Sequence, residues 1–429
     1  MKGQQASVDS LHSLSLRHLK AVRSIADHGS VTGAANSLNR SQSALSKALR
    51  ELEEQLATRL FDRSPRGVVP TPRGHAFIER IREAEARFAE AEVSYRAFAR
   101  GKQVTRHNPV FTLDVSQKRL AAFLALYETR DVQAAADKLG QTRAAVYGSI
   151  RYLEGLLELA LFEHAGPHIT SSVFADVLAN HAKLAFALIR HGIDELRCVG
   201  GVTEGSVAIG TLPYSRTELT PRTIHRVLEE HPQLRISTRE GPYTILEAAL
   251  RNGDLDLIIG ATRNIETGSK LAKEVLFEDE LSVISGRHHP LAKANKVTLS
   301  ELLAYGWVLP VRQTPARALF DEFLARQGAP SPNQIVETSS LSTIRGLLLA
   351  SDRLALLSRH QVHYEEAAGL LAALPIRLKG TRRPIGITLR AHTTPSPAAS
   401  LFISELRNMT PRFKQSGLWK NRGGSGAQG

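Results

Sequence analysis

A short run near the amino end, SQSALSKALR, combines hydroxyl, amide and cationic side chains in a spacing that suits nucleic acid. Glutamine can pair with adenine edges, serine contacts bases or phosphates, and lysine and arginine contact phosphates and purine edges. On a helix that starts after Ser41, these side chains share the exposed side of the N-terminal half, the half that enters a major groove in helix-turn-helix proteins. The candidate DNA-contacting residues of this run are Ser41, Gln42, Ser43, Ser46, Lys47 and Arg50.

The stretch after this run, residues 59–74, is rich in arginine and is interrupted by glycine and proline, which shape tight turns. It predicts a hairpin-like wing in which Arg63 and Arg66 reach the DNA backbone. A solvated arginine-rich loop is the alternative.

Three predicted helices position the candidate residues. The first has apolar residues at helical spacing from Leu16 and stops at His28-Gly29, and Ser30 or Thr32 can cap the second. Asn39-Arg40 forms a tight turn before the third helix, so that the second and third helices describe a helix-turn-helix. The third helix is expected to bury Ala44, Leu45, Leu49, Leu52 and Leu56.

Residues 19–61 align with residues 120–162 at a constant offset of 101 and without a gap. Thirteen of 43 positions are identical, and most of the identical residues are apolar at helical spacing. The sequence therefore predicts two tandem helix-turn-helix units.

The second copy lacks several of the DNA-contacting features. Arg143 and Arg151 remain as candidate contacts, but Lys47 is replaced by Gly148 and the second wing has no arginine. Residues 112–172 hold 6 basic and 7 acidic side chains, against 10 and 5 in residues 14–75. Because affinity for DNA depends on phosphate neutralisation, we expect the second copy to bind DNA weakly by itself.

The composition narrows the function classes. The net charge is +13, and 18 basic against 11 acidic residues lie in the first 110 positions, which favours an anionic partner. A single cysteine, and the lack of GxSxG, P-loop and HExxH motifs, predict no catalytic residues, no metal site and no cofactor. With no signal peptide and no apolar stretch of membrane-spanning length, we expect a cytoplasmic protein with no membrane contact.

The run TGAANSLNRSQSALSKALRELEEQL, followed by LFDR and TPRG, resembles the LysR-type transcriptional regulators. In that family the stretch matching Ser41–Ser46 is the recognition helix, and the wing arginines match Arg63 and Arg66. The resemblance implies double-stranded DNA, a small-molecule effector, RNA polymerase and further copies of the chain as partners, in a nucleoid-associated protein. Pro70 departs from the leucine that is more frequent in the family.

Two amphipathic helices follow the two copies, at residues 76–101 and 172–200. The resemblance implies that such a linker helix dimerises, whereas packing within one chain is the alternative. We hypothesise that the two copies and their linker helices fold together, so that one chain mimics the family's DNA-binding dimer.

From residue 205 onward, short apolar runs alternate with helical patterns, which indicates parallel α/β units. The stretch HPQLRISTREGPYTILEAALRNGDLDLIIG resembles the family's effector domain, a two-lobed module of the periplasmic-binding-protein type. RRPIGITLRA is similar to the subgroup of the galactose-binding-protein regulator. Ligands of open α/β modules bind at the carboxyl ends of strands. The hydroxyls and helix N-termini expected at these ends would suit an anionic or polyhydroxyl effector. The candidate effector residues are Tyr214, Ser215, Thr262, Thr314, Ser339 and Ser340, although each hydroxyl could instead cap a helix.

The predicted fold class is therefore multidomain, with two α-helical winged helix-turn-helix units and a two-lobed α/β effector domain. The boundaries are 14–75 and 112–171 for the winged units, 76–101 and 172–200 for the linker helices, 205–265 with 372–407 for lobe I, 266–371 for lobe II, and 408–429 for a disordered basic tail. The predicted function is a regulator that senses a metabolite and controls transcription. The alternative is a metabolite-binding α/β protein or enzyme whose helical part serves only for dimerisation.

Overall fold

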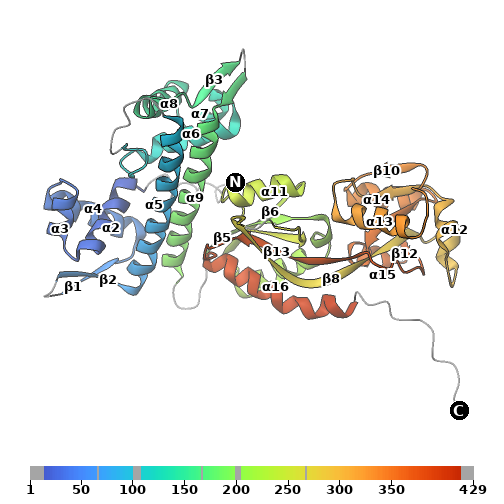
Figure 1. Ribbon diagram of the computed structural model, residues 1–429. Coiled ribbons are helices and arrows are strands. Elements are labelled where there is room, and N and C mark those ends of the chain that lie inside the picture. The colour runs from blue at the N-terminus through green and yellow to red at the C-terminus, as the bar shows by residue number, and fades with distance from the viewer. Residues whose placement is uncertain are drawn as a thin grey trace. The chain divides into compact units, whose positions relative to one another are not determined.

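The computed structural model describes residues 14–64, 67–99, 108–165, 168–198, 204–265 and 268–416. The chain divides into two compact units: a helical unit, Met1–Gly205 with Arg251–Asp254, and an α/β unit, Ser206–Leu250 with Leu255–Gly429 (Figure 1). None of the described helices is both long and apolar enough to cross a membrane.

The helical unit contains the same order of elements twice. The first set is α2 (Leu16–His28), α3 (Val31–Ser37), α4 (Gln42–Leu56), β1 (Phe61–Ser64), β2 (Gly67–Pro70) and α5 (Pro72–Phe98). The second set is α6 (Gln117–Thr129), α7 (Val132–Leu139), α8 (Arg143–Leu157), β3 (Phe162–Ala165), β4 (His168–Ser171) and α9 (Val173–Arg197). Each pair of strands forms an antiparallel hairpin. We call α2 to β2 the first winged segment and α6 to β4 the second winged segment.

A glutamate holds the hairpin against the third helix in both winged segments. Glu53 Oε1 accepts hydrogen bonds from the backbone N–H groups of Leu60 and Phe61, at 2.6 and 3.3 Å. The residue 101 positions later, Glu154, accepts from Leu161 at 2.8 Å and from the following residue at 3.3 Å. These bonds satisfy backbone donors that would otherwise be left unpaired at the base of the wing, which gives the retained glutamates a structural role.

The long helices α5 and α9 pack against each other in antiparallel fashion. Arg80, near the start of α5, bonds Glu195, near the end of α9, and the ring of Tyr95 lies 5.5 Å from that of Phe174 at the opposite end. The two winged segments, which precede these helices, therefore lie at opposite ends of the pair (Figure 1). Their buried apolar residues and those of α5 and α9 belong to one core, so the segments fold as a single unit.

The α/β unit is built on one sheet of nine strands in the described residues, in the order β10-β9-β11-β8-β13-β7-β5-β6, with β12 paired to β8. Separate apolar cores lie at its two halves, so the unit has two lobes joined by the long strands β8 and β13. The strands are β5 (Gly205–Thr211), β6 (Leu234–Glu240), β7 (Leu257–Ala261), β8 (Leu271–Gly286), β9 (Trp307–Leu309), β10 (Ile335–Glu337), β11 (Leu354–Ser358), β12 (Leu371–Ala373) and β13 (Arg382–Arg390). The helices are η1 (Pro213–Ser215), α10 (Leu219–Glu230), α11 (Tyr243–Arg251), η2 (Pro290–Lys293), α12 (Leu299–Leu303), α13 (Pro315–Arg326), α14 (Leu341–Ala350), η3 (Arg359–Val362), α15 (His363–Ala367) and α16 (Pro397–Ser416).

The structure moves one lobe boundary. Strand β8 begins at Leu271 and pairs with β13 as far as Glu280. Its first half therefore belongs to lobe I, whereas lobe II was predicted to begin at residue 266. Asp279 lies inside this strand as a buried carboxylate, and its Oδ1 accepts a 2.7 Å hydrogen bond from Ser358.

Two further expectations were wrong. Helix α16 continues to Ser416 where the tail was predicted to begin at 408, because Met409 and Phe413 are buried and Phe413 stacks on Phe277 at 5.8 Å. Residues 417–429 lie outside the described ranges. On α4, Ala44 is exposed, and Ala48 takes a buried place on the inner face with Leu45 and Leu52.

Candidate functional site

Helix α4 presents the first candidate surface. Ser41 caps it, because its Oγ accepts a 3.2 Å hydrogen bond from the N–H of Ala44. The predicted side chains Ser41, Gln42, Ser43, Ser46, Lys47 and Arg50 are all exposed. We call these six residues the α4 face. Its first turn contains no acidic residue, so the partial positive charge of the helix start is available to an anion.

The two cations of the α4 face have only weak partners within the helix. Lys47 Nζ lies 3.6 Å from a carboxylate oxygen of Glu51, and the Lys47 side chain remains 66% exposed. Arg50 Nε lies 3.9 Å from Glu54, and the Arg50 side chain is 70% exposed. Exposed pairs of this kind contribute little, so both cations can turn to a phosphate or a base edge.

The first wing is anchored to the turn after α2. The N–H of Val68 donates to the carbonyl of Gly29 at 3.0 Å. Gly67 has a φ of +126°, and a Cβ there would lie 2.5 Å from the same carbonyl oxygen, so only glycine fits. Arg66 and the side chain of Arg63 lie outside the described residues, so their predicted DNA contacts stay predictions.

Helix α8 occupies the equivalent place in the second winged segment. Thr142 caps it by accepting a 3.2 Å hydrogen bond from the N–H of Ala145, and both predicted arginines, Arg143 and Arg151, are exposed. Where the first segment has His18 beside Glu51, the second has the guanidinium of Arg119 over the ring of Tyr152, 3.4 Å from its centre.

The predicted effector residues follow the carboxyl ends of two pairs of parallel strands. Strands β5 and β7 are neighbours; Thr262 comes directly after β7, and Tyr214 lies in η1 just beyond the end of β5. In the other lobe β9 and β10 are neighbours, and Thr314 and Ser340 follow these. The lobes meet at these edges, because Arg263 donates a 3.4 Å hydrogen bond to the carbonyl of Gln313.

Several of these hydroxyls are already occupied. Ser215 Oγ donates to the carbonyls of Leu212 and Ile259, both at 3.1 Å, and Ser215 is fully buried. Thr314 and Ser340 cap α13 and α14. Ser339 is exposed beside the second cap. The helix-capping alternative therefore describes Thr314 and Ser340, and it leaves Tyr214 and Thr262 as the stronger candidates for ligand contact.

Tyr214 and Thr262 are 3% and 7% exposed, and among the described residues neither hydroxyl has a hydrogen-bond partner. A buried hydroxyl without a partner is unfavourable, and a polar ligand would satisfy it. Burial, and after it the charge of Asp279, raises the pKa of the Tyr214 phenol, which therefore stays protonated and able to donate at neutral pH.

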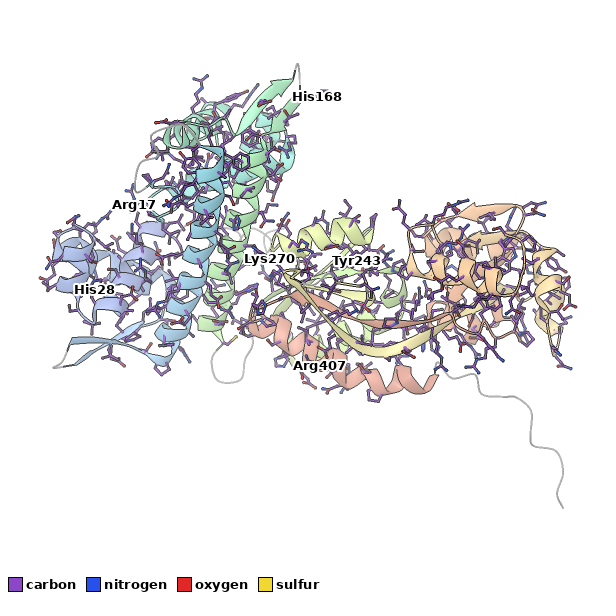
Figure 2. All side chains as sticks on the ribbon, viewed as in Figure 1. Arg17, His28, His168, Tyr243, Lys270 and Arg407 are labelled. Carbon is purple, nitrogen blue, oxygen red and sulfur yellow. The ribbon has the colours of Figure 1, made fainter. Side chains whose placement is uncertain are left out.

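Two residues beside these hydroxyls escaped the sequence-based predictions. The Arg263 guanidinium lies 5.2 Å from the ring centre of Tyr243, which Figure 2 labels. His360, from the other lobe, has its ring 5.8 Å from that of Tyr214. Arg263 follows Thr262 directly and could have been found as a cation at a strand end. His360 carries no such signal, because only the tertiary fold brings it to Tyr214.

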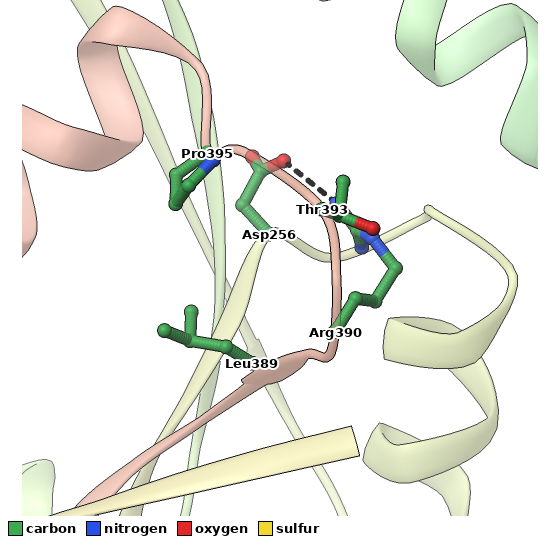
Figure 3. A pocket seen from close by; sticks show the side chains of 5 residues that line it. All are labelled: Asp256, Leu389, Arg390, Thr393 and Pro395. Atoms are coloured by element: carbon green, nitrogen blue, oxygen red, sulfur yellow. Dashed lines mark ion pairs between the residues drawn. The ribbon is translucent and has the colours of Figure 1, made fainter. Parts of the chain in front are cut away.

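A small pocket lies elsewhere in the α/β unit, between the end of β13 and the loop before β7 (Figure 3). Its lining residues are Asp256, Leu389, Arg390, Thr393 and Pro395. Arg390 donates to the carbonyl of Leu250 at 2.9 Å and lies 3.8 Å from Asp256, whose other oxygen accepts from the N–H of Ala208. These polar groups hold the strands together, and none of the predicted effector residues lines this pocket.

Comparison with known proteins identifies both units. Residues 16–75 and 117–172 match the family described as bacterial regulatory helix-turn-helix protein, lysR family. Residues 200–411 match the LysR substrate binding domain. A full-length OxyR variant from Pseudomonas aeruginosa has a similar fold, with a TM-score of 0.52 at 22% identity over 69% of this chain and 94% of that one.

Two curated relatives are transcriptional regulators. The HTH-type transcriptional regulator GalR of Pseudomonas putida is 34% identical over 92% of this chain and 97% of its own length. The regulator PcaQ of Agrobacterium fabrum is 28% identical over 68% of this chain and 93% of its own length. The two family matches and the 34% identity to GalR over 92% of this chain show that the chain belongs to the LysR family of transcriptional regulators, not to the enzymes.

Proposed function

We propose that this regulator binds its operator chiefly through the α4 face, with Arg63 and Arg66 of the first wing on the DNA backbone. The observation that carries the proposal is the exposure of all six predicted side chains on a capped helix whose apolar face is buried. Such a helix can enter a major groove without rearranging its own core.

We further propose that one chain takes the place of the family's DNA-binding dimer. The antiparallel packing of α5 on α9 supports this arrangement, because each helix covers the apolar stripe of the other. The second winged segment then contributes less to affinity than the first, since it lacks the counterparts of Lys47 and the wing arginines. Assemblies of the chain would hold half as many copies as those of relatives with one winged segment.

In the α/β unit, the proposed effector is an anionic or polyhydroxyl metabolite held by Tyr214 and Thr262, with Ser215, Thr314, Ser339 and Ser340 shaping the strand ends around it. A ligand that binds a closed arrangement of the lobes more tightly shifts the population toward that arrangement. The shift would alter how DNA is bent or how RNA polymerase is engaged, in a cytoplasmic protein located at the nucleoid.

Mobility-shift titrations of the full-length protein at fixed salt test the DNA assignment. Replacing Lys47 and Arg50 by alanine is expected to abolish operator binding, and replacing Arg143 and Arg151 is expected to weaken it less. A double Arg96→Ala, Lys118→Ala variant removes two exposed cations outside α4 and α8 and serves as the control. Equal losses in the two test variants would refute the asymmetry.

Footprinting on the protein's own upstream region, repeated across a panel of organic acids and sugars, tests the effector assignment. With the wild-type protein, one class of metabolite is expected to change the length or the cleavage pattern of the footprint. With Tyr214→Phe, the same metabolites are expected to leave the footprint unchanged. An unchanged response in that variant would exclude the Tyr214 hydroxyl from the effector site.

A further inference from the structure

The exposed side of α8 differs from the α4 face at almost every position. Counting from the cap, Ser41, Gln42 and Ser43 correspond to Thr142, Arg143 and Ala144. Further along, Ser46, Lys47, Arg50 and Glu51 correspond to Tyr147, Gly148, Arg151 and Tyr152. In this set only Arg50 and Arg151 are the same residue type. The two helices nevertheless make the same hydrogen bonds at their caps and to their hairpins.

Helix α8 is net positive, whereas residues 112–172 as a whole are net negative. Several of the seven acidic side chains of residues 112–172 have partners within the protein: Asp114 bonds Lys20, Glu128 pairs with Lys138 and Lys183, Asp131 caps α7, and Glu154 of α8 holds the hairpin. In the described part of the chain, Arg143 and Arg151 have no ion-pair partner, whereas the cations of the α4 face each lie near a glutamate. The net negative segment therefore presents a positive helix face, which is complementary to DNA.

Packing within the chain does not require the two glycines of α8. A Cβ at Gly148 or Gly155 would meet no atom within 4 Å, so neither residue is needed for packing. Glycine weakens a helix interior, and in open space alanine would be the better residue. Small residues at Ala144 and Gly148 do allow the helix backbone to come close to the edges of bases.

We propose that α8 reads a second half-site that differs in sequence from the half-site read by α4, so that the operator of this protein is not an inverted repeat. The inference rests on the proposed DNA binding of the first winged segment and extends it to the second. Arg143 and Arg151 are two turns apart, about 12 Å along the axis, and would pair with guanines about three to four base pairs apart. Tyr147, half-buried between them, supplies an apolar edge for thymine methyl groups.

Affinity and discrimination are then divided between the two helices. The first winged segment, with Lys47 and the wing arginines, supplies phosphate contacts that hold any sequence. Helix α8 adds little phosphate neutralisation but gains affinity where its arginines meet guanine. A relative with two identical recognition helices must read dyad-symmetric DNA, and a chain with two different helices has no such requirement.

The test is selection of bound duplexes from a randomised pool with the full-length protein at moderate salt. The expected product is a site with two unlike elements, one of them containing guanines at the proposed separation. Arg143→Ala and Arg151→Ala should each lower affinity for this site about tenfold or more and remove the preference at that element alone. Lys118→Ala, which removes an exposed cation from α6, should change neither preference.

Salt dependence separates the two kinds of contact. Lys47→Ala should weaken binding to all sequences and reduce the slope of affinity against salt by about one, whereas Arg143→Ala should leave binding to unrelated DNA unchanged. An inverted repeat, or a second element that the arginine variants still prefer, would overturn the inference while leaving the role of α4 intact. Failure of the wild-type chain to enrich any sequence would instead overturn the proposed DNA binding itself. Equal unfolding midpoints establish that the variants are folded.

Discussion

Arg80 of α5 donates its Nε hydrogen to Oε1 of Glu195 on α9 at 3.0 Å, across 115 positions of sequence. The arginine is only 4% exposed and also bonds Glu83, so it is a buried charge whose partners come from both long helices. An ordered charge in this place fixes how the two helices align, because any slip along the pair would separate Arg80 from Glu195.

Arg80→Ala is expected to destabilise the helical unit by about 2–4 kcal/mol, since it leaves the carboxylate of Glu195 without its partner and opens a gap beside Phe77. Urea unfolding of the full-length protein, followed by helical circular dichroism, measures the loss. Arg96→Ala is the matched control, because Arg96 is an exposed residue of the same helix paired with Glu92 at i−4, and it should change stability by about 0.5 kcal/mol or less. Similar losses in both variants would contradict the alignment role.

Gly192 marks the close approach of α9 to α5. A Cβ there would lie 2.8 Å from Cδ2 of Phe77 and 3.1 Å from Cβ of Arg80. Gly192→Ala should therefore destabilise the helical unit by about 1–3 kcal/mol despite the better helix propensity of alanine. Gly155→Ala on α8, where the added methyl meets open space, should stabilise the same unit by about 0.5–1 kcal/mol. Thermal unfolding measures both, and a stabilising Gly192→Ala would show that the helices are further apart.

Asp114 links the start of the second copy to α2. Its carboxylate accepts a hydrogen bond from Lys20, and its backbone carbonyl accepts from Arg17, labelled in Figure 2, at 2.9 Å. Partial burial alone would raise the pKa of Asp114, but the bond and charge of Lys20 outweigh it, so the pKa lies below the ordinary value of 3.8.

A folded-state pKa below the unfolded one means that the ionised carboxylate stabilises the fold at neutral pH and that this stabilisation disappears as pH falls below about 4. Asp114→Asn should lower stability by about 0.5–1 kcal/mol at pH 7, and the difference from wild type should be smaller at pH 3. Unfolding curves at both pH values test the sign. A difference that grows on acidification would contradict the assigned pKa direction.

Tyr214→Phe removes a buried hydroxyl that has no partner among the described residues. Without effector, the variant should be as stable as wild type or more stable by about 1 kcal/mol, because the desolvation penalty of the unpaired hydroxyl is lost. Ser215→Ala is the comparison: its hydroxyl bonds two carbonyls, so this variant should lose about 1 kcal/mol. Unfolding of the α/β unit in the absence of ligand measures both. A clear loss of stability in Tyr214→Phe would show that its hydroxyl is bonded within the protein.

Local patterns predicted much of the helical unit. The constant offset of 101 predicted the second set of elements, and the caps at Ser41 and Thr142 lie where hydroxyl residues precede a periodic run. Ala44 was assigned to the buried face, but it is exposed, and the buried residues of α4 are Leu45, Ala48 and Leu52. The start of lobe II was placed too early, at residue 266, because the pairing of the first half of β8 with β13 joins residues far apart in the sequence.

The amino-acid order by itself determined which residues α4 and α8 expose, since helical periodicity and capping are properties of neighbouring residues. It also determined that the two faces differ in chemistry. Only the tertiary structure decided that α5 packs on α9 of the same chain, that His360 reaches Tyr214, and that Glu154 of α8 bonds the backbone at the base of the wing. These relationships join residues far apart in sequence, and the energies that select them, burial of apolar surface and pairing of charges, arise only when the whole unit is assembled.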